Sequence, residues 1–401
     1  MPKRYATPKI VTLHNPEKAY PGYTLFGGMG GRDVWLMNME GEFVHRWKVH
    51  DLLGVHGRLL PNGYLLVGNR MPNSPVADMA ASGGDLIELD WDGNVVWRYE
   101  NLYINHHDFY RMENGNTLIS VWIPIPESVA KQIKGGRPGS EREGIIWSDC
   151  LQEITPNGQV IWEWKAYEHM DLEKDTICPL CSRVTWSYIN SIFVIPGGDI
   201  LISIRVLNAI AIIDKTTGKI RWRWGAEEIG HQHNPTMLGN GNILLFDNGL
   251  HCQSKAINPS RSRVIEVNPQ TEKIEWEYVD PDLMSFYSPI CAGAQRLPNG
   301  NTLICEATKG RIFEATPKKE TVWECFSPFY FHYRPEFFGE YTNMVYRAHR
   351  YSPDYPGLKG KDLQPGRFEW VLQEKGKPEV QPEESKEKEK AVQDRLAKLG
   401  Y

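Results

Sequence analysis

The stretch TMLGNGNILLF, residues 236–246, consists of two apolar segments joined by an Asn-Gly turn. This combination is the strongest local signal for a β-hairpin, because Asn and Gly tolerate the positive φ angles of a two-residue turn. Four other stretches have the same form, one with Gly-Gly in place of Asn-Gly. They are RLLPNGYLLVG (58–68), FYRMENGNTLIS (109–120), FVIPGGDILIS (193–203) and QRLPNGNTLIC (295–305). The chain is therefore expected to repeat one hairpin unit.

A tryptophan-centred segment recurs six times, at intervals of about fifty or sixty residues. The segments are GEFVHRW ending at Trp47, GNVVWRY around Trp97, GQVIWEW around Trp162, GKIRWRW around Trp222, EKIEWEY around Trp276 and ETVWEC around Trp323. Repeats of this period are typical of arrays in which each unit buries its faces against its neighbours. With the hairpin and a strand such as DLIELDW (85–91), each unit has four strands, which is the composition of a propeller blade.

The sequence predicts an all-β fold, a six-bladed β-propeller with four-stranded blades. The sequence contains six tryptophan strands but only five hairpins, so the sixth blade needs strands from both ends of the chain. PGYTLFGG (21–28), VWLMNM (34–39) and FVHRW (43–47) are expected to pair with the C-terminal strand 344–351. Such closure removes open sheet edges. The expected boundaries are an N-terminal extension 1–20, the propeller 21–358 and a C-terminal extension 359–401.

Segments that interrupt the repeat are expected to be lids or binding loops, because long loops in compact domains often carry function. They are 123–148, 165–187 and 326–343. Aromatic residues in or beside these segments indicate either a flat or aromatic ligand or the packing of a lid. These residues are Trp122, Trp147, Trp186, Tyr330 and Tyr333. After about residue 373 the sequence is too charged and too poor in apolar residues to join a core, and we expect a mobile tail.

Composition favours a small-molecule ligand. The net charge of −5 over 401 residues, without a basic block, argues against nucleic acid as a partner. The N-terminus lacks the apolar core of a secretory signal, and no apolar run reaches membrane-spanning length, so a soluble cytoplasmic protein without membrane contact is expected. Seven scattered cysteines do not resemble a disulfide framework and are expected to be reduced.

The first strand of a propeller blade lines the central tunnel, and equivalent positions there are rich in histidine. They are His56, His107, Asn190, His233, Cys291 to Gly293, and Arg347 with His349. A single histidine at a strand start is usually a hydrogen-bonded polar residue, and His106 and His231 are interpreted in this way. Together, His107, His233 and His349 indicate a site where a proton moves, a nucleophile acts or a metal binds.

Two other motifs are weaker signals. CPLC, Cys178 to Cys181, is half of a zinc-ligand pattern, but no second pair lies at metal-ligand spacing and Cys150 is the only conceivable third ligand. Loop packing is the first interpretation of CPLC, and metal binding is the second. GGMGG (27–31) lacks the lysine and helix of a phosphate-binding loop and is interpreted as a tight blade turn.

The chain resembles the arylsulfotransferase family, in particular its shorter bacterial and fungal members. The resemblance covers about residues 18–358. The stretches that carry it are AYPGYTLF (19–26), NHHDFYRMENGNTLIS (105–120), INSIFVIPGGDILISIR (189–205), HNPTMLGNGNILLFDNG (233–249), SRVIEV (262–267) and YRAHRYSPDY (346–355).

This resemblance implies a six-bladed propeller that moves a sulfuryl group between phenols through a sulfated histidine, without a cofactor. His107, His233 and His349 are then the expected catalytic residues, and which of them is sulfated is left open. Arg347 or Arg263 would neutralise the sulfuryl oxygens. The expected substrate-binding residues are His56, Tyr188, Asn190, Arg205, His251, Arg263 and Arg347.

Several departures from the family pattern leave other functions open. Characterised members are exported and have an additional N-terminal β-domain; here Tyr188 stands where relatives often have histidine, and LHCQSKA (250–256) stands where an arginine is expected. The alternative is a metal-dependent lyase or hydrolase, in which His56, His107, His233 and His349 hold Mn, Fe or Zn. A third possibility is a non-catalytic propeller that binds proteins, which would not explain four tunnel histidines.

Overall fold

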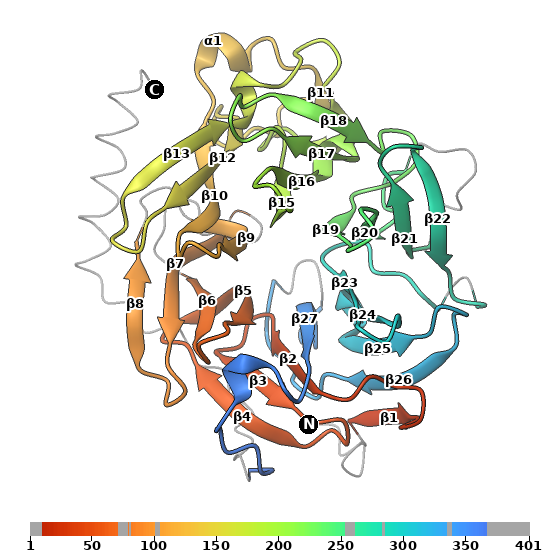
Figure 1. Cartoon of the computed structure of the whole chain (residues 1–401). Coiled ribbons are helices and arrows are strands. Elements are labelled where there is room, and N and C mark those ends of the chain that lie inside the picture. The colour runs from red at the N-terminus through yellow and green to blue at the C-terminus, as the bar shows by residue number, and fades with distance from the viewer. Residues whose placement is uncertain are drawn as a thin grey trace. The chain divides into compact units, whose positions relative to one another are not determined.

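A computed structural model describes residues 10–70, 79, 82–100, 105–252, 261–282, 285–334 and 339–366. The chain forms two compact units. The first comprises Met1–Asn69, Ile87–Arg98 and Ile290–Gly376, and the second comprises Arg70–Leu86, Tyr99–Pro289 and Lys377–Tyr401. Strands predominate throughout (Figure 1). The helices in the described part of the chain are short: α1 (Glu127–Ala130), η1 (Ala166–Glu168), η2 (Arg205–Leu207), η3 (Ala307–Lys309) and η4 (Pro356–Leu358). The predicted all-β class is confirmed.

The first unit confirms that the two ends of the chain share a sheet. The C-terminal strand pairs antiparallel with an N-terminal strand, with Leu25 opposite His349, in the order β27-β2-β3-β4. These strands are β27 (Val345–Tyr351), β2 (Tyr23–Gly28), β3 (Asp33–Met37) and β4 (Phe43–Lys48). The GGMGG stretch is the tight turn that was predicted, because Gly31 N donates to Gly28 O at 3.0 Å between β2 and β3.

A second sheet of the first unit has five strands rather than the four expected. Its order is β1-β26-β25-β24-β23. The extra strand is β1 (Val11–His14), which lies in the predicted N-terminal extension and pairs antiparallel with β26. The other strands are β23 (Gly293–Arg296), β24 (Thr302–Glu306), β25 (Arg311–Ala315) and β26 (Thr321–Phe326). The N-terminal segment thus covers an edge that would otherwise present unpaired backbone groups.

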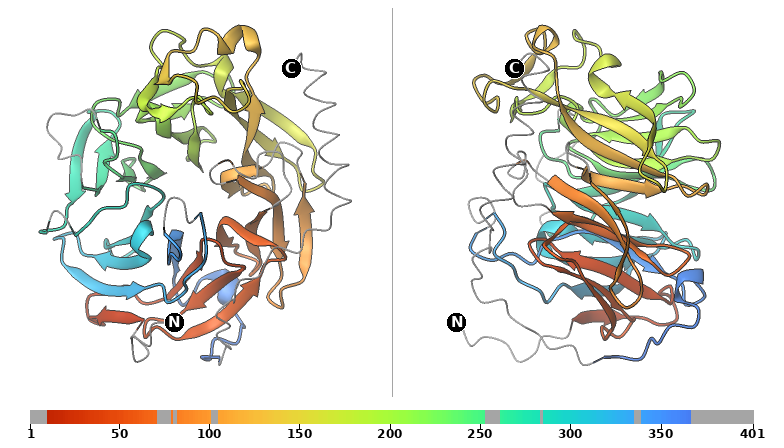
Figure 2. Two further views of the ribbon diagram at one scale, coloured as in Figure 1. Left: turned by 180° about the vertical axis from the view of Figure 1, so that it is seen from behind. Right: turned by 90° about the vertical axis from the view of Figure 1, so that its left-hand side faces the viewer.

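Two four-stranded sheets of the second unit are antiparallel meanders, in which strands consecutive in sequence lie side by side (Figures 1 and 2). One contains β15 (Ile189–Val194), β16 (Ile200–Ile204), β17 (Ala209–Ile213) and β18 (Ile220–Trp224). The other contains β19 (His233–Met237), β20 (Ile243–Asp247), β21 (Arg263–Asn268) and β22 (Lys273–Tyr278). This strand order is that of a propeller blade.

The predicted number of six separate blades is corrected to four. The remaining strands form one eight-stranded sheet, because β7 pairs with β9 through Ser82 opposite His106 and Gly84 opposite Asn105. Its order is β13-β12-β10-β9-β7-β6-β5, with β8 beside β7. The strands are β5 (Leu52–Leu59), β6 (Leu65–Arg70), β7 (Ser82–Leu89), β8 (Val95–Tyr99), β9 (Asn105–Arg111), β10 (Thr117–Pro124), β12 (Trp147–Ile154) and β13 (Val160–Lys165).

Two tryptophans of the recurring segments join adjacent sheets through their indole nitrogens. Trp164 on β13 donates to the carbonyl of Gly218, in the turn between β17 and β18, at 2.8 Å. Trp323 on β26 donates in the same way to Met39, in the turn between β3 and β4, at 2.9 Å. Both indoles are buried. A buried indole N–H needs an acceptor. At these two positions the acceptor is a backbone carbonyl in a turn of the adjacent sheet.

The long segments between repeats have structure of their own. Segments 123–148 and 165–187 meet in a two-stranded parallel sheet of β11 (Gly135–Arg137) and β14 (Ile177–Ser182). Phe331 and Thr342 form an isolated bridge within 326–343. Whether these segments act as lids stays a prediction. The predicted charged tail after about residue 373 lies outside the described residues.

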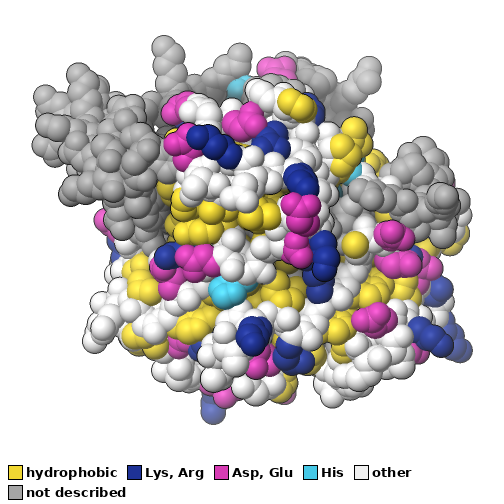
Figure 3. All heavy atoms as spheres, turned by 90° about the horizontal axis from the view of Figure 1, so that it is seen from above, with side chains coloured by type: hydrophobic (Ala, Val, Ile, Leu, Met, Phe, Trp, Pro, Cys, Tyr) yellow, Lys and Arg dark blue, Asp and Glu magenta, His cyan; other side chains and the backbone are white. Residues whose placement is uncertain are grey.

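The surface is of mixed charge. On the face drawn in Figure 3, Lys and Arg side chains lie beside Asp and Glu side chains. Among the described residues, an ion pair joins Glu127 on α1 to Lys131, the residue after α1, at 2.7 Å. None of the helices in the described part of the chain has the length and apolar character needed to cross a lipid bilayer.

Candidate functional site

A buried chain of two imidazoles and a carboxylate lies at the start of β9 in the second unit. His106 Nδ1 is 2.7 Å from His107 Nδ1. On its other side, His106 Nε2 is 3.0 Å from Ser120 Oγ and 3.2 Å from Asp149 Oδ1. Ser187 donates a hydrogen bond to the second oxygen of Asp149. His106, interpreted from the sequence as an ordinary polar residue, therefore connects His107 to a carboxylate.

This arrangement determines the tautomer of His107. A lone pair on His106 Nε2 would be repelled by the carboxylate, so Nε2 carries the hydrogen and donates it to Ser120 beside the charge of Asp149. His106 Nδ1 then has the lone pair and accepts a hydrogen bond from His107 Nδ1–H. The lone pair of neutral His107 is consequently on Nε2, the nitrogen that can act as a base or nucleophile.

The surroundings of His107 keep its ring uncharged and fixed. Burial lowers the pKa of His107 well below its usual value, and the electrostatic effects of His106, His233 and Arg205 lower it further. Tyr188 lies edge-on to the ring at a centroid distance of 4.7 Å. Both residues have positive φ, 54° for His107 and 55° for Tyr188. Residues other than glycine rarely hold this conformation, and such strain concentrates at functional sites.

His233, at the start of β19, also has its tautomer set by neighbours. Its Nδ1 is 2.7 Å from Asn248 Oδ1, and Asn248 Nδ2 donates to the carbonyl of Ser288 at 2.7 Å. Because the amide nitrogen of Asn248 is engaged as a donor, its oxygen accepts from His233 Nδ1–H. A neutral His233 therefore also has its lone pair on Nε2. Asn190 fixes the backbone of Gln232, the residue before His233, because its Nδ2 donates to Gln232 O at 2.8 Å.

The two arginines predicted for this part of the chain have different surroundings. Arg205 lies over the ring of Tyr188, with Cζ 5.1 Å from the centroid, and its charge acts on His107. Arg263 donates to Asp247 at 2.7 Å, to Glu277 at 2.9 Å and to a backbone carbonyl at 2.6 Å. Arg263 thus supports neighbouring backbone, and Arg205 is the better placed cation for an anionic substrate.

Three of the predicted site residues, His56, Arg347 and His349, belong to the first unit. His56 stacks on Tyr346 at a centroid distance of 5.7 Å, and its ring is 6.0 Å from that of His349. The guanidinium of Arg347 lies over Tyr346 at 5.3 Å. These residues form one cluster within their unit. The four-histidine metal site, which combines His56 and His349 with residues of the second unit, stays a prediction.

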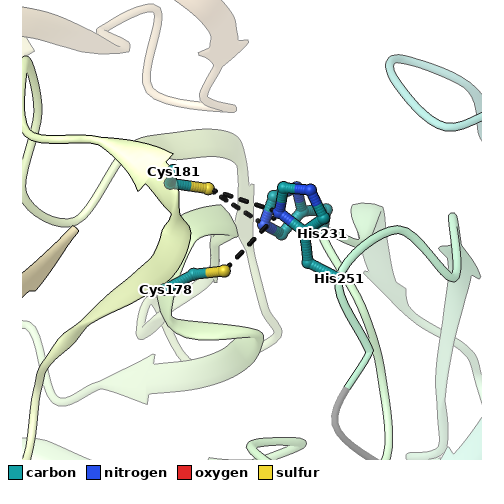
Figure 4. Close-up of side chains that lie close together, drawn as sticks. All are labelled: Cys178, Cys181, His231 and His251. Carbon is teal, nitrogen blue, oxygen red and sulfur yellow. Dashed lines mark hydrogen bonds between the residues drawn. The ribbon is translucent and has the colours of Figure 1, made fainter. Parts of the chain in front are cut away.

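A second cluster in the second unit was only partly anticipated. Cys178, Cys181, His231 and His251 each direct one potential ligand atom to a common point, and all four atoms lie within 4.8 Å of one another. Figure 4 shows the two sulfur atoms, both from β14, facing the two imidazoles. Cys181 Sγ is 3.4 Å from His231 Nε2 and 3.6 Å from His251 Nδ1. Cys178 Sγ is 3.5 Å from the same nitrogen of His251. Among the described residues, this is the group able to hold a metal ion.

The local sequence explains why both sulfurs point the same way. In the pairing of β11 with β14, Gly135 lies opposite Ile177 and Arg137 opposite Ser182, so β14 contains extra residues. The excess bulges outward, leaving Pro179 and Leu180 exposed and the two cysteines buried. A bulge of this kind redirects side chains that strict alternation would separate.

Asn208 holds the backbone of both histidines. Its Oδ1 accepts from His231 N at 2.9 Å, and its Nδ2 donates to His251 O at 3.3 Å. The Asp247 carboxylate, paired with Arg263, also accepts from Gly230 N at 2.8 Å and from Gly249 N at 3.2 Å. The loops that carry the histidines are therefore fixed by neighbouring side chains.

Burial and hydrogen bonding shift the pKa values within the cluster. Burial lowers the pKa of His231 to about 3, and the charge of Arg205 adds to this effect, so this imidazole is neutral. The interaction between the two cysteines lowers the pKa of Cys178 and, together with burial, raises the pKa of Cys181.

The sequence identified CPLC but not its partners. His251 was predicted to bind substrate and His231 to be an ordinary polar residue, whereas the structure places both beside the cysteines. The sequence separations of 50 and 73 residues are outside the usual spacing of zinc motifs. The available signal was a CxxC pair together with two histidines next to glycine turns.

Comparison with known proteins supplies the family context. Residues 82–328 match the sequence model of a family described as Arylsulfotransferase (ASST). A comparison with curated proteins gave no match. The solved structure of a protein of unknown function from Bacteroides caccae is similar over 82% of this chain and 98% of that chain, with 14% identity and a TM-score of 0.53. This likeness shows the fold alone.

Two lyase structures resemble the chain more weakly. The match to a streptogramin B lyase structure covers 84% of this chain and 92% of the lyase chain, with 10% identity and a TM-score of 0.45. The match to a virginiamycin B lyase from Staphylococcus aureus covers 68% of this chain and 69% of the lyase chain, with 14% identity and a TM-score of 0.39. Similarity at this level carries no argument about function.

Proposed function

Because the chain belongs to the arylsulfotransferase (ASST) family, we propose that it transfers a sulfuryl group from an aromatic sulfate ester to an acceptor hydroxyl through His107. The observation that carries this proposal is the 2.7 Å contact between His106 and His107, which leaves the lone pair of His107 on Nε2. The lowered pKa of His107 adds support, since a neutral imidazole is required for nucleophilic attack.

In the first half of the reaction, His107 Nε2 attacks the sulfur atom of the ester. An N–S bond forms, the S–O bond to the aromatic group breaks, and the phenolate leaves with the bonding electrons. The sulfated ring becomes cationic, and its Nδ1–H remains hydrogen-bonded to His106. Asp149, 3.2 Å from the far side of His106, stabilises this charge as a carboxylate stabilises an imidazolium in hydrolytic triads.

In the second half, the hydroxyl of an acceptor attacks the same sulfur and the N–S bond breaks. The acceptor loses its proton to a base, and His233 is the candidate, because its hydrogen bond to Asn248 places the lone pair on Nε2. His107 returns to its neutral form. His233 releases its proton to solvent and the phenolate takes one proton from solvent, so the products are the new sulfate ester and the free phenol, and atoms and charge balance over the cycle.

Arg205 is the proposed anion-binding group. A sulfate monoester is negatively charged, and more charge develops on the leaving oxygen in the transition state. Arg205 is the cation whose field acts on His107, and its guanidinium is held over Tyr188. Tyr188 itself would contact the aromatic part of the substrate. His349 and Arg347, which the family resemblance implies as a catalytic and a substrate-binding residue, lie in the first unit, and their roles stay predictions.

The proposal is tested with 4-nitrophenyl sulfate as donor and phenol as acceptor. We expect a burst of 4-nitrophenolate equal to the enzyme concentration, and mass spectrometry should locate one SO3 group on the peptide that contains His107. His107→Asn should lose about 10³-fold or more in kcat, while His50→Asn, at an exposed position, should keep full activity. Transfer that persists in folded His107→Asn protein would exclude this histidine as nucleophile.

A further inference from the structure

We propose that Cys178, Cys181, His231 and His251 form a tetrahedral site for one Zn2+ ion per chain, with a structural role. The site is separate from the proposed sulfuryl transfer, which requires no metal. It rests on four ligand atoms that converge from three segments of the second unit.

The distances agree with zinc coordination. Zn–S bonds of about 2.3 Å and Zn–N bonds of about 2.0–2.1 Å in a tetrahedron separate sulfur from nitrogen by about 3.5–3.6 Å. Three of the four sulfur–nitrogen distances in the cluster are 3.5, 3.4 and 3.6 Å. These three pairs therefore already have a spacing close to the one that a bound ion would impose.

The sulfur and nitrogen atoms of the cluster contact one another in more than one pairing. His251 Nδ1 lies at nearly equal distances from Cys178 Sγ and Cys181 Sγ, at 3.5 and 3.6 Å, and Cys181 Sγ is also 3.4 Å from His231 Nε2. A metal ion at the common point would contact the nitrogens and both sulfurs simultaneously.

The ligand set selects the metal and its role. Two thiolates and two neutral imidazoles are typical of Zn2+, and the charge of the ion cancels that of the sulfurs, which suits a largely buried position. Three of the four ligands are buried and His251 is half-buried. Four protein ligands leave no position for water or substrate, so the site is structural rather than catalytic.

Contacts outside the four ligands prepare the site. Asn208 binds the backbone of both histidines, at 2.9 and 3.3 Å, and the β14 bulge turns both cysteines inward. Second-shell support of this kind is usual in metal centres. It orders the ligands before the ion arrives, as a specific site requires.

The ion would also position Arg205. The charge of Arg205 acts on Cys181, and the Arg205 guanidinium lies over Tyr188 at 5.1 Å. A zinc-bound thiolate is a fixed acceptor, so metal binding would hold the guanidinium beside Tyr188 and His107. This consequence depends on the proposed function, whereas the metal site does not.

The direct test is metal analysis of protein purified without chelator and then dialysed. We expect one equivalent of zinc, and the cobalt-substituted protein should show the intense visible bands of tetrahedral coordination and a thiolate-to-cobalt charge-transfer band in the near ultraviolet. Protein that takes up less than about one tenth of an equivalent of zinc from an equimolar solution would overturn the proposal, as would a preference for another metal.

Variants assign the ligands. The double variant Cys178→Ser, Cys181→Ser should lose zinc, whereas Cys252→Ser, which removes the thiol next to His251, should retain it. Loss of zinc from Cys252→Ser would refute the ligand assignment. If the double variant fails to fold, titration of the wild-type thiols with a mercurial replaces it: zinc should be released as two thiols react, and release that does not follow thiol modification counts against the site. His107→Asn should keep its zinc, which separates failure of this inference from failure of the proposed function.

Discussion

The rings of His106 and His107 meet through their Nδ1 atoms at 2.7 Å, although the two residues are neighbours in sequence. Adjacent side chains on a regular strand point to opposite faces. Here the positive φ of His107, 54°, breaks the alternation and lets the second imidazole turn back onto the first. The backbone strain thus has a specific result, which is a His107 tautomer controlled by Asp149 on β12, the second strand from β9 in the sheet.

Asp149→Asn should disable His107 without removing it. An amide can donate to His106 Nε2, so His106 would place its hydrogen on Nδ1 and donate it to His107 Nδ1. The hydrogen of His107 would then be on Nε2, and its lone pair would no longer face the substrate. We expect kcat for aryl sulfate transfer to fall by about 10²–10⁴-fold with little change in KM.

Ser120→Ala is the matched control for Asp149→Asn. It removes the hydrogen bond to His106 Nε2 but keeps the carboxylate at 3.2 Å, so the tautomer should persist and kcat should fall by less than about tenfold. Equal losses in the two variants would show that the charge of Asp149 does not control His107.

The tryptophan hydrogen bonds predict unequal effects of one substitution at two positions. Trp164→Phe removes the donor to Gly218 O and should lower the free energy of unfolding by about 1–3 kcal/mol. The buried Nε1 of Trp222 has no hydrogen-bond acceptor among the described residues, so Trp222→Phe should cost less than about 1 kcal/mol. Urea unfolding monitored by circular dichroism measures both, and equal destabilisation would contradict the role given to the indole N–H.

The features predicted correctly from the sequence depend on local chemistry. Asn-Gly turns and apolar alternation determine hairpins over a few residues, and the tryptophan period reflects a contact repeated between sheets. The joining of β7 to β9 was not predictable in this way. It depends on the pairing of Ser82 with His106, which joins strands of two different repeat units and which no local sequence pattern predicts.

The candidate sites show the same limit. Histidines at strand starts could be identified from the sequence. The contact of Asp149 with His106 is made across two strands, and no local sequence pattern predicts it. In the cysteine cluster, CPLC was visible, whereas its partners are brought in by Asn208 and by left-handed backbone at His231 and His251, with φ of 54° and 57°. Such contacts depend on tertiary structure rather than on spacing in the chain.

His45 in the first unit should make stability depend on pH. Its ring stacks on Trp91 at 3.8 Å and meets Trp47 edge-on at 4.2 Å. Burial lowers the pKa of His45 to about 4, whereas an unfolded histidine titrates near 6.5. Between these values the unfolded chain binds an extra proton, so stability is fully present above pH 6.5 and decreases as the pH falls toward 4.

His45→Phe should flatten that part of the pH profile, because phenylalanine keeps the stacking and cannot be protonated. The contribution of one proton is at most about 1.4 kcal/mol per pH unit, and partial exposure of the ring makes the actual slope smaller. Urea unfolding between pH 8 and pH 4.5 provides the measurement, with each protein referred to its own stability at pH 8. Parallel profiles for the two proteins would rule out His45 as the titrating group.

Asn208 provides a test of how the cysteine and histidine cluster is organised. Its backbone is left-handed, with φ of 50°, so Asn208→Gly preserves the conformation and removes only the side chain that holds His231 and His251. We expect zinc affinity to fall by about 10–100-fold, as for other losses of outer support around a metal. Asn208→Asp keeps the acceptor for His231 N but lacks the donor to His251 O, so it should give an intermediate loss. Competition with a chromophoric zinc chelator measures all three proteins. Unchanged affinity in Asn208→Gly would mean that the ion, rather than the asparagine, orders the two histidines.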